Sequence, residues 1–216
     1  MGGPARAFQS SIAATIDLDL GLPTMSRARA RPDMPRWLAE GGLNSDGRAP
    51  QVASLVLRNP ALLDELLRAL EDKDPRVRGH AADALERIAR EKPEWLEAHL
   101  PTLLRQAPRD PIPMVRWHLA MILGRLALDE DRVDRILPCL LSLLTDSSPF
   151  VRSWAISSLC LVARKHPRRQ ARIVRRLVSL RRHASKAVRV RSQKAALVLT
   201  GDLPVPDSWI KLRRAG

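Results

Sequence analysis

The sequence predicts an all-α fold: an α-solenoid of about four stacked helical hairpins with an N-terminal capping helix. Aromatic residues make up only 3% of the 216 residues, whereas 45% are hydrophobic. Sandwich and barrel folds depend on aromatic and β-branched side chains, so this balance favours packed helices. The charged fraction of 28% is typical of a folded chain. A third observation, an internal repeat, predicts how the helices are arranged.

The repeat is marked by a Val-Arg pair that recurs at intervals of 38, 36 and 37 residues. The four pairs are Val77-Arg78, Val115-Arg116, Val151-Arg152 and Val188-Arg189. Apolar residues recur 15 and 11 residues before each Val, and apolar or small residues recur 4, 8 and 11 residues after it. Such spacings place side chains on one face of a helix, so each repeat predicts two helices. A single hairpin cannot bury both faces, and the units must therefore stack.

The turn between the two helices of a repeat carries residues that cap helices. Asp74-Pro75, Ser148-Pro149 and Ser185-Lys186 place an oxygen-bearing side chain where it can accept an unpaired backbone N–H. Proline fits the first helical position, where no N–H is needed. Ile112-Pro113 departs from this pattern, so the second repeat lacks a predicted side-chain cap.

The predicted organisation consists of an extension, a cap, four repeats and a tail. The segments are a flexible N-terminal extension at 1–34, capping helices at 35–59, repeats at 60–92, 93–129, 130–166 and 167–201, and a basic C-terminal tail at 202–216. Gly201 is expected to end the last helix, and Trp209 is expected to dock on the end of the solenoid. Met25 is a second candidate for the first residue of the protein.

An Asp five residues before the Val-Arg pair and a Pro two residues before it, followed by a helix rich in Ala and Leu, resemble the HEAT repeat family. The resemblance is close to the bacterial HEAT-like branch of that family and covers about residues 60–200. The resemblance implies a right-handed superhelix whose second helices line a concave face, and such solenoids serve mostly as binding surfaces. It also implies a ladder in which these Asp and Arg side chains tie adjacent repeats together. The acids are Asp72, Asp110 and Asp146, whereas the fourth repeat has His183, which leaves Arg189 without an acid.

Several protein classes are excluded by the sequence. The longest apolar runs are far shorter than the roughly 20 residues that a membrane helix requires. The first 30 residues lack the apolar core of a signal peptide, since Asp17 and Asp19 interrupt the one candidate stretch. Cys139 and Cys160 lie within apolar helical patterns, as expected of buried thiols in a reducing compartment. We therefore expect a soluble, cytoplasmic protein.

The net charge of +14 lies entirely in the last quarter of the chain. Residues 161–216 contain 16 basic side chains, most of them Arg, against two acids. A guanidinium group can bind a phosphate through two hydrogen bonds. Several such groups on a rigid surface release the counterions of a polyanion when it binds. The residues expected to bind a polyanion are Arg168, Arg169, Arg172, Arg175, Arg176, Arg181, Arg182, Lys186, Arg189, Arg191 and Lys194.

The expected polyanion is DNA or RNA, bound through its phosphate backbone, because the segment has almost no aromatic residues to stack on bases. An acidic protein and membrane lipid are the alternatives. A solvated cap that only keeps the last repeat soluble would not require so one-sided a charge.

Three residues early in second helices are candidate contacts on the concave face: Trp117, His118 and Trp154. The alternative interpretation is that the tryptophans fill gaps between repeats. His80 and His118 occupy the same position in neighbouring repeats, but no Cys or carboxylate completes a metal set with them at a recognised spacing. We therefore expect no metal and no cofactor.

Two functions fit the sequence. The first is a non-catalytic scaffold that binds a protein or peptide through its concave face and a polyanion through its basic end. The second is an enzyme resembling the HEAT-like alkylpurine DNA glycosylases, for which Asp83, Trp117, Trp154 and Arg152 are the only residues of suitable type. None of them lies in a motif of that family, so no catalytic residue is assigned.

Overall fold

The computed structural model describes residues 33–210, and within this range every regular element is a helix. The predicted extension at 1–34, apart from its last two residues, and Met25 lie outside the described residues. So do Lys211, Arg213 and Arg214 of the predicted basic tail. None of the helices in the described part is long and apolar enough to cross a membrane.

The described helices follow the predicted repeat register. The capping helices are α1 (Met34–Leu38) and α2 (Ala49–Arg58). The first helices of the repeats are α3 (Leu63–Arg68), α5 (Leu100–Gln106), α7 (Glu130–Ser142) and α9 (Pro167–Ser179), and the second helices are α4 (Pro75–Glu91), α6 (Pro113–Leu126), α8 (Pro149–Lys165) and α10 (Lys186–Thr200). Short 3₁₀ turns adjoin the first helices at η1 (Pro60–Leu62), η2 (Ala69–Glu71), η3 (Pro93–His99), η4 (Leu143–Thr145) and η5 (Leu180–Arg182), and α11 (Asp207–Ile210) comes last.

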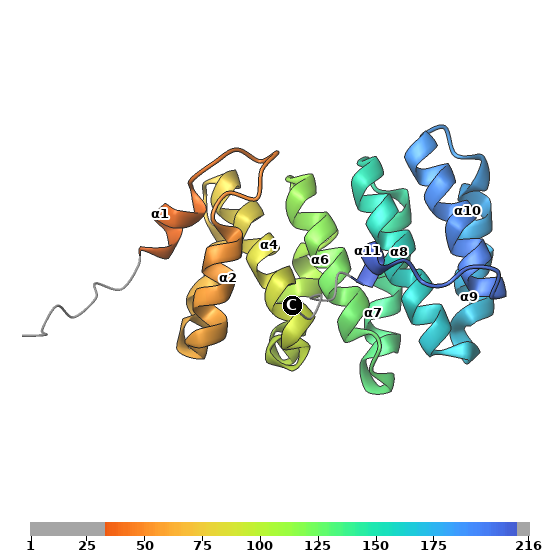
Figure 1. The fold of residues 1–216 in the computed structure, drawn as a ribbon, viewed down its shortest axis with the longest axis horizontal. Helices are drawn as coiled ribbons and strands as arrows, with labels where there is room; N and C mark the ends of the chain where they lie inside the picture. Colours follow the sequence, from red (N-terminus) through yellow and green to blue (C-terminus); the bar gives the residue numbers. More distant parts are fainter. Residues whose placement is uncertain (1–32, 211–216) are drawn as a thin grey trace, which may run out of the picture. The chain divides into compact units, whose positions relative to one another are not determined.

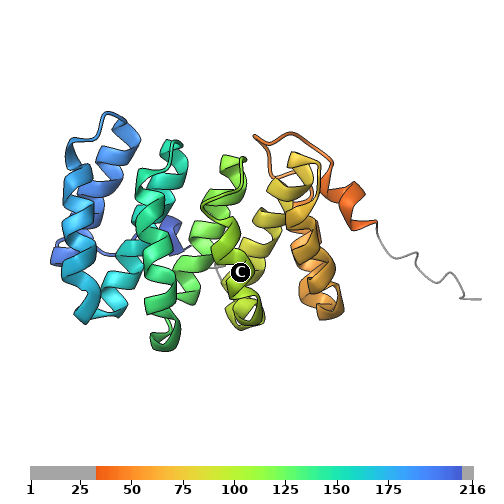
Figure 2. The same cartoon turned by 180° about the vertical axis from the view of Figure 1, so that it is seen from behind.

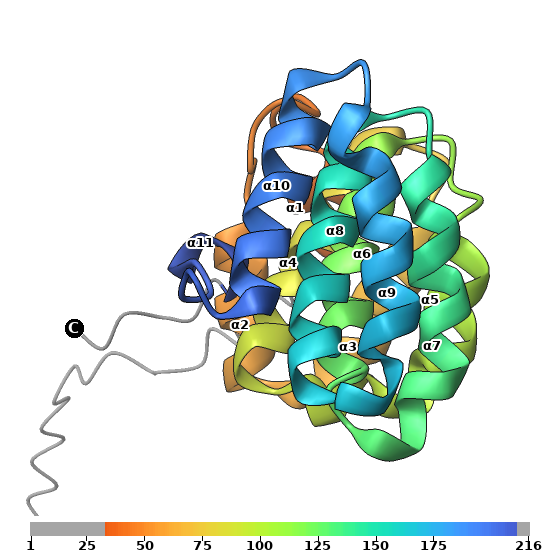
Figure 3. The ribbon, with the colours of Figure 1, turned by 90° about the vertical axis from the view of Figure 1, so that its right-hand side faces the viewer.

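The hairpins stack side by side along one axis, in chain order (Figures 1 and 2). Seen along that axis, the helices form two layers, with α4, α6, α8 and α10 in one and α3, α5, α7 and α9 in the other (Figure 3). Successive second helices contact one another directly from α2 to α10. We call the outer surface of the layer of second helices the second-helix face.

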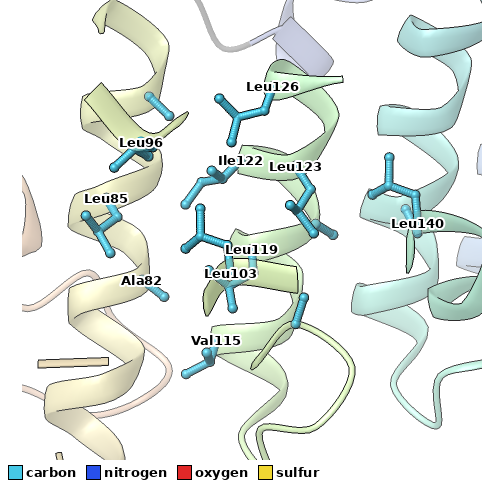
Figure 4. Packing of buried hydrophobic residues seen from close by; sticks show 14 of the residues in the cluster. Ala82, Leu85, Leu96, Leu103, Val115, Leu119, Ile122, Leu123, Leu126 and Leu140 are labelled. Carbon is cyan, nitrogen blue, oxygen red and sulfur yellow. The ribbon is translucent and has the colours of Figure 1, made fainter. Parts of the chain in front are cut away.

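The core lies between the two layers and contains most residues of the predicted apolar columns, although Leu104 is only half-buried (Figure 4). All four Val residues of the Val-Arg pairs are buried, with exposed fractions of 3% or less. The last repeat differs, because Ala196 and Leu199 are only half-buried where no fifth repeat follows in the described chain. Close approach of α6 and α8 depends on Gly124, since a Cβ there would lie 2.5 Å from Ser158 Cβ.

The observed helix caps in the turns before the second helices agree only in part with the prediction. Asp74 accepts the backbone N–H of Arg76 at 2.8 Å as predicted, but the hydroxyls of Ser148 and Ser185 make no capping hydrogen bond. In every repeat the residue two positions before the N-cap instead accepts the N–H of the N-cap residue itself, which fixes the turn but does not cap the helix. These hydrogen bonds join Asp72 to Asp74 (2.8 Å), Asp110 to Ile112 (2.8 Å), Asp146 to Ser148 (2.7 Å) and His183 to Ser185 (3.0 Å).

The Arg side chains of the repeats form the ladder that the resemblance implied. Each ladder Arg donates to the backbone carbonyl six residues before it and, in the first three repeats, to a side chain of the following repeat. The carbonyl acceptors are those of Asp72, Asp110, Asp146 and His183. The pairs between repeats are Arg78–Asp110 (3.2 Å), Arg116–Asp146 (2.7 Å) and Arg152–His183. Arg189 ends the ladder on the carbonyls of His183 and Ala184 and pairs with no carboxylate of residues 33–210.

The two cysteines and His80 lie in or beside the core. Cys139 and Cys160 are free thiols, half-buried and buried, and burial raises their pKa values to about 11 and about 12. His80 ties the capping segment to α4, since its ring nitrogens lie 2.6 Å from the carbonyl oxygen of Leu38 and 3.1 Å from that of Ser45.

Candidate functional site

A groove of about 710 Å³ lies between the N-terminal halves of α8 and α10 on the second-helix face. It exposes unusual apolar surface, because Phe150 is 65% exposed and Val190 is 52% exposed. Lys186 and Arg191 add positive charge to its lining. The lining residues are Pro149, Phe150, Ser153, Trp154, Lys186, Ala187, Val190 and Arg191.

The three predicted contacts on this face have different surroundings. Trp154 lines the groove, and Trp117 is half-buried beside it, with its ring centroid 5.6 Å from that of Phe150. His118 is buried, which corrects the expectation that it faces a partner. Its Nε2 accepts the indole N–H of Trp117 at 3.2 Å, and its Nδ1 lies 2.9 Å from the carbonyl oxygen of Met114. His118 therefore orients Trp117 from inside the core.

Arg191 joins the groove to the C-terminal segment. Its guanidinium lies over the ring of Trp154 at 5.2 Å and over the ring of Trp209 at 5.3 Å, and it donates to Ser157 Oγ at 2.7 Å. Trp209 is 5% exposed and belongs to α11, which packs against α8. The predicted docking of Trp209 on the end of the solenoid is therefore wrong: the segment turns back along the second-helix face (Figures 1 and 3).

A second arginine of this face contacts the same segment. Arg125 of α6 donates an N–H from Nη2 to the backbone carbonyl of Ile210. Arg125 also lies 3.8 Å from Oε1 of Glu86, a fully buried carboxylate whose other oxygen accepts from Arg90 Nε at 2.8 Å. Burial lowers the pKa of Arg125 and of Arg191, and at Arg125 the charge of Glu86 opposes this shift.

Three of the eleven predicted polyanion contacts are engaged within the chain. Arg169 pairs with Glu130 at 2.6 Å and with Asp134 at 2.8 Å, and its hydrogen bonds hold the pKa of both carboxyls below the usual range. Arg189 donates to backbone carbonyls, and Arg191 contacts two indoles. The expectation that all eleven side chains can bind a polyanion is therefore wrong for these three, which are half-buried and already contact other groups of the chain.

The remaining eight cations are exposed and form no ion pair with a carboxylate in the described part of the chain. They divide between the two layers, since only Lys186 and Lys194 belong to α10. The other six form what we call the α9 basic surface: Arg168, Arg172, Arg175 and Arg176 on α9, and Arg181 and Arg182 in η5. Part of this surface borders an open depression of about 570 Å³ that reaches Pro138 and Leu141 of α7.

Two of the four residues considered for an enzyme, Asp83 and Arg152, form contacts inside the fold. Asp83 is 2% exposed, with its carboxylate 3.0 Å from Arg87 Nε and 3.6 Å from His118 Nε2. Arg152 belongs to the ladder. No group of three or more His, Cys, Asp or Glu side chains within residues 33–210 is placed to hold a metal ion.

Sequence reasoning missed Phe150, Val190 and Arg125. Phe150 immediately precedes the buried Val151, and Val190 immediately follows the ladder residue Arg189, and a single apolar residue at either place carries no periodic signal. Arg125 lies near the end of α6, where a basic residue is ordinary. The one available signal was the exposed aromatic at the position just before Val151, because the equivalent positions hold Arg76, Met114 and Ala187.

Comparison with known proteins yields a family and a fold. The pattern described as HEAT repeats matches residues 100–200, and the pattern described as HEAT repeat matches residues 62–91. No curated protein sequence matches the chain significantly. The chain is similar in structure to computationally designed armadillo repeat proteins for modular peptide recognition, with a TM-score of 0.54 and 18% identity over 76% of this chain and 79% of theirs. It is also similar to an engineered protein, with a TM-score of 0.57 and 19% identity over 78% of this chain and 80% of that one.

Proposed function

Because the chain belongs to the HEAT repeat family, we propose that it is a non-catalytic scaffold whose second-helix face binds a peptide segment of a partner protein. The groove between α8 and α10 carries this proposal. Exposed apolar surface of this kind marks interaction sites when it is contiguous and bordered by polar residues. Phe150 and Val190 supply that surface, and Lys186 borders it.

The lining also indicates the chemistry of the peptide. An apolar side chain of the peptide would fill the space between Phe150 and Val190. A buried anchor side chain of this kind, above all an aromatic one, supplies most of the binding energy of an interface. An acidic neighbour would lie near the ammonium group of Lys186. A role without catalysis is supported by the burial of Asp83 and by the engagement of Arg152 in the ladder. The designed armadillo proteins of related fold are described as recognising peptides, which agrees with this use of stacked second helices.

Selection of random twelve-residue peptides on the immobilised full chain tests this function. We expect enriched peptides to combine an apolar anchor with Asp or Glu. Val190→Asp should weaken the selected peptides at least about tenfold, because a carboxylate in an apolar site forfeits more than 1.4 kcal/mol. Val178→Asp is the matched control, since Val178 is 48% exposed on α9, in the other layer. Failure to enrich any peptide, or equal affinity for both variants, would contradict the proposal.

The α9 basic surface favours a second binding function, attachment to the phosphate backbone of DNA or RNA. Four of its arginines recur along α9 at spacings that place them on one side of the helix. Their guanidinium groups have no carboxylate partner in residues 33–210, so no carboxylate of this part of the chain would compete with a bound phosphate. Such contacts position a nucleic acid without reading its sequence.

Binding of duplex DNA or RNA by the full chain should weaken steeply as salt rises, with little sequence preference. Changing Arg175, Arg176, Arg181 and Arg182 to Glu should abolish it, as measured by fluorescence anisotropy. The control has the same net charge but reverses four exposed arginines of the capping segment and the first two repeats: Arg58, Arg68, Arg105 and Arg109. Persistence of binding in the first variant, equal loss in the control, or no binding at low salt would overturn this function.

A further inference from the structure

The chain reverses direction after the last repeat. Gly201 ends α10 with a φ of +91°, a left-handed conformation that side chains other than glycine rarely adopt. The N–H of Leu203 then donates to the carbonyl of Leu197 at 3.1 Å, which holds the start of the reversed segment against the end of α10. Pro204 and Pro206 fix their own φ angles, and residues 204–206 form no regular element. The segment at 203–210 is thereby directed back over α8 towards α6 (Figure 1).

Two kinds of contact hold this segment, and both are typical of peptide recognition. A side-chain anchor, Trp209, is nearly buried under the guanidinium of Arg191. A backbone contact follows one residue later, where Arg125 donates to the carbonyl of Ile210. The receptor residues come from three successive repeats, with Arg125 on α6, Trp154 on α8 and Arg191 on α10. Such contacts do not require the segment to be part of the same chain.

The segment is attached more weakly than the repeats it covers. Its helix, α11, has four residues and cannot be stable without its docking contacts. Asp207 and Ser208 are exposed, whereas Leu203, Val205 and Trp209 pack against the core. Segments with few buried apolar contacts open at a small fraction of the free energy of global unfolding.

The segment also has the chemistry that the groove favours. Asp207 precedes Trp209 by two residues, so an acidic side chain and an aromatic anchor occur together. The anchor shares Arg191 with Trp154, a residue that lines the groove between α8 and α10. The docked segment and the groove are therefore adjacent parts of one surface.

We infer that residues 203–210 are an internal ligand of the second-helix face, and that the partner peptide resembles them, with an aromatic residue that stacks on Arg191 and an acidic residue before it. This inference rests on the proposed peptide-binding function and adds its regulation. A partner must displace the segment to reach Arg191 and Arg125. A tethered segment of this length competes at an effective concentration of roughly 1 mM, so a segment with an intrinsic Kd of about 0.1 mM would weaken an outside peptide about tenfold.

The test uses the full chain and a labelled eight-residue peptide with the sequence of residues 203–210. Trp209→Ala should release the segment, and the labelled peptide should then bind at least about tenfold more tightly than it binds the unchanged chain. Hydrogen exchange of residues 203–210 should also accelerate in this variant. Ser208→Ala is the control, because Ser208 is exposed in the same helix and its loss should leave the segment docked.

A third variant identifies the receptor. Combining Arg191→Lys with Trp209→Ala should abolish binding of the labelled peptide, because an ammonium group does not reproduce the planar contact of the guanidinium with the indole. If Trp209→Ala changes neither peptide affinity nor hydrogen exchange, the inference is wrong, even when selected peptides bind the groove. If no selected peptide binds the groove, either in the unchanged chain or in the Trp209→Ala variant, the proposed function itself is wrong.

Discussion

Replacing Asp146 with Ala is expected to destabilise the protein by about 3–5 kcal/mol, the usual cost of leaving one member of a buried ion pair without its partner. The Nε and Nη2 groups of Arg116 donate to the two oxygens of Asp146 at 2.7 Å and 2.9 Å. The two side chains are only 9% and 8% exposed, so water screens this pair weakly. Asp146 also accepts the N–H of Ser148, and its removal weakens the turn before α8 as well. Urea unfolding followed by circular dichroism measures the loss.

Asp134→Ala is the matched control for the ladder. Asp134 pairs with Arg169 at a similar distance, 2.8 Å, but its side chain is 74% exposed. Exposed pairs contribute little because solvent screens them, and we expect a far smaller change in the free energy of unfolding. Equal losses in the two variants would mean that the ladder adds nothing beyond ordinary surface pairing.

Leu159→Ala is expected to cost about 2–5 kcal/mol, because the variant loses buried apolar contacts and leaves a cavity. Leu159 lies on α8 with an exposed fraction of 0%, at the apolar position eight residues after Val151. Since α8 contacts both α6 and α10, the cavity would open where three repeats meet. The free energy of unfolding in urea again reports the effect.

Leu197→Ala provides the comparison for the core. Leu197 lies on α10, in the same layer, but is 44% exposed. Its truncation removes little buried surface, and we expect a loss well below that of Leu159→Ala. A cost within experimental error for Leu159→Ala would show that the apolar column has been misplaced.

The repeats could be predicted because stacking imposes the same burial on equivalent positions. Val77, Val115 and Val151 all face the same kind of neighbour, so one column of the sequence reports one environment. This reasoning fails where equivalent positions have different neighbours. His80 holds the capping segment, whereas His118 supports Trp117, although both follow their Val by three residues.

The C-terminal segment could not be predicted for a related reason. The contacts of Trp209 with Arg191 and of Ile210 with Arg125 have no equivalent in another repeat of residues 33–210, so no repeat reveals them. The Arg169 pairs could not be predicted from the charge pattern of the last repeat, because Glu130 and Asp134 belong to the preceding repeat. Composition predicted the basic end of the chain but not which of its charges the fold neutralises.

The indole ¹⁵N–¹H signals of the five tryptophans test the binding of a peptide to the second-helix face most directly. Trp154 and Trp209 lie on that face, whereas Trp37 belongs to α1 and Trp95 to η3. Titration with a selected acidic, aromatic peptide should shift the signals of Trp154 and Trp209 in proportion to binding and leave those of Trp37 and Trp95 unchanged. Saturable binding that leaves Trp154 and Trp209 unperturbed would place the peptide elsewhere and contradict the account.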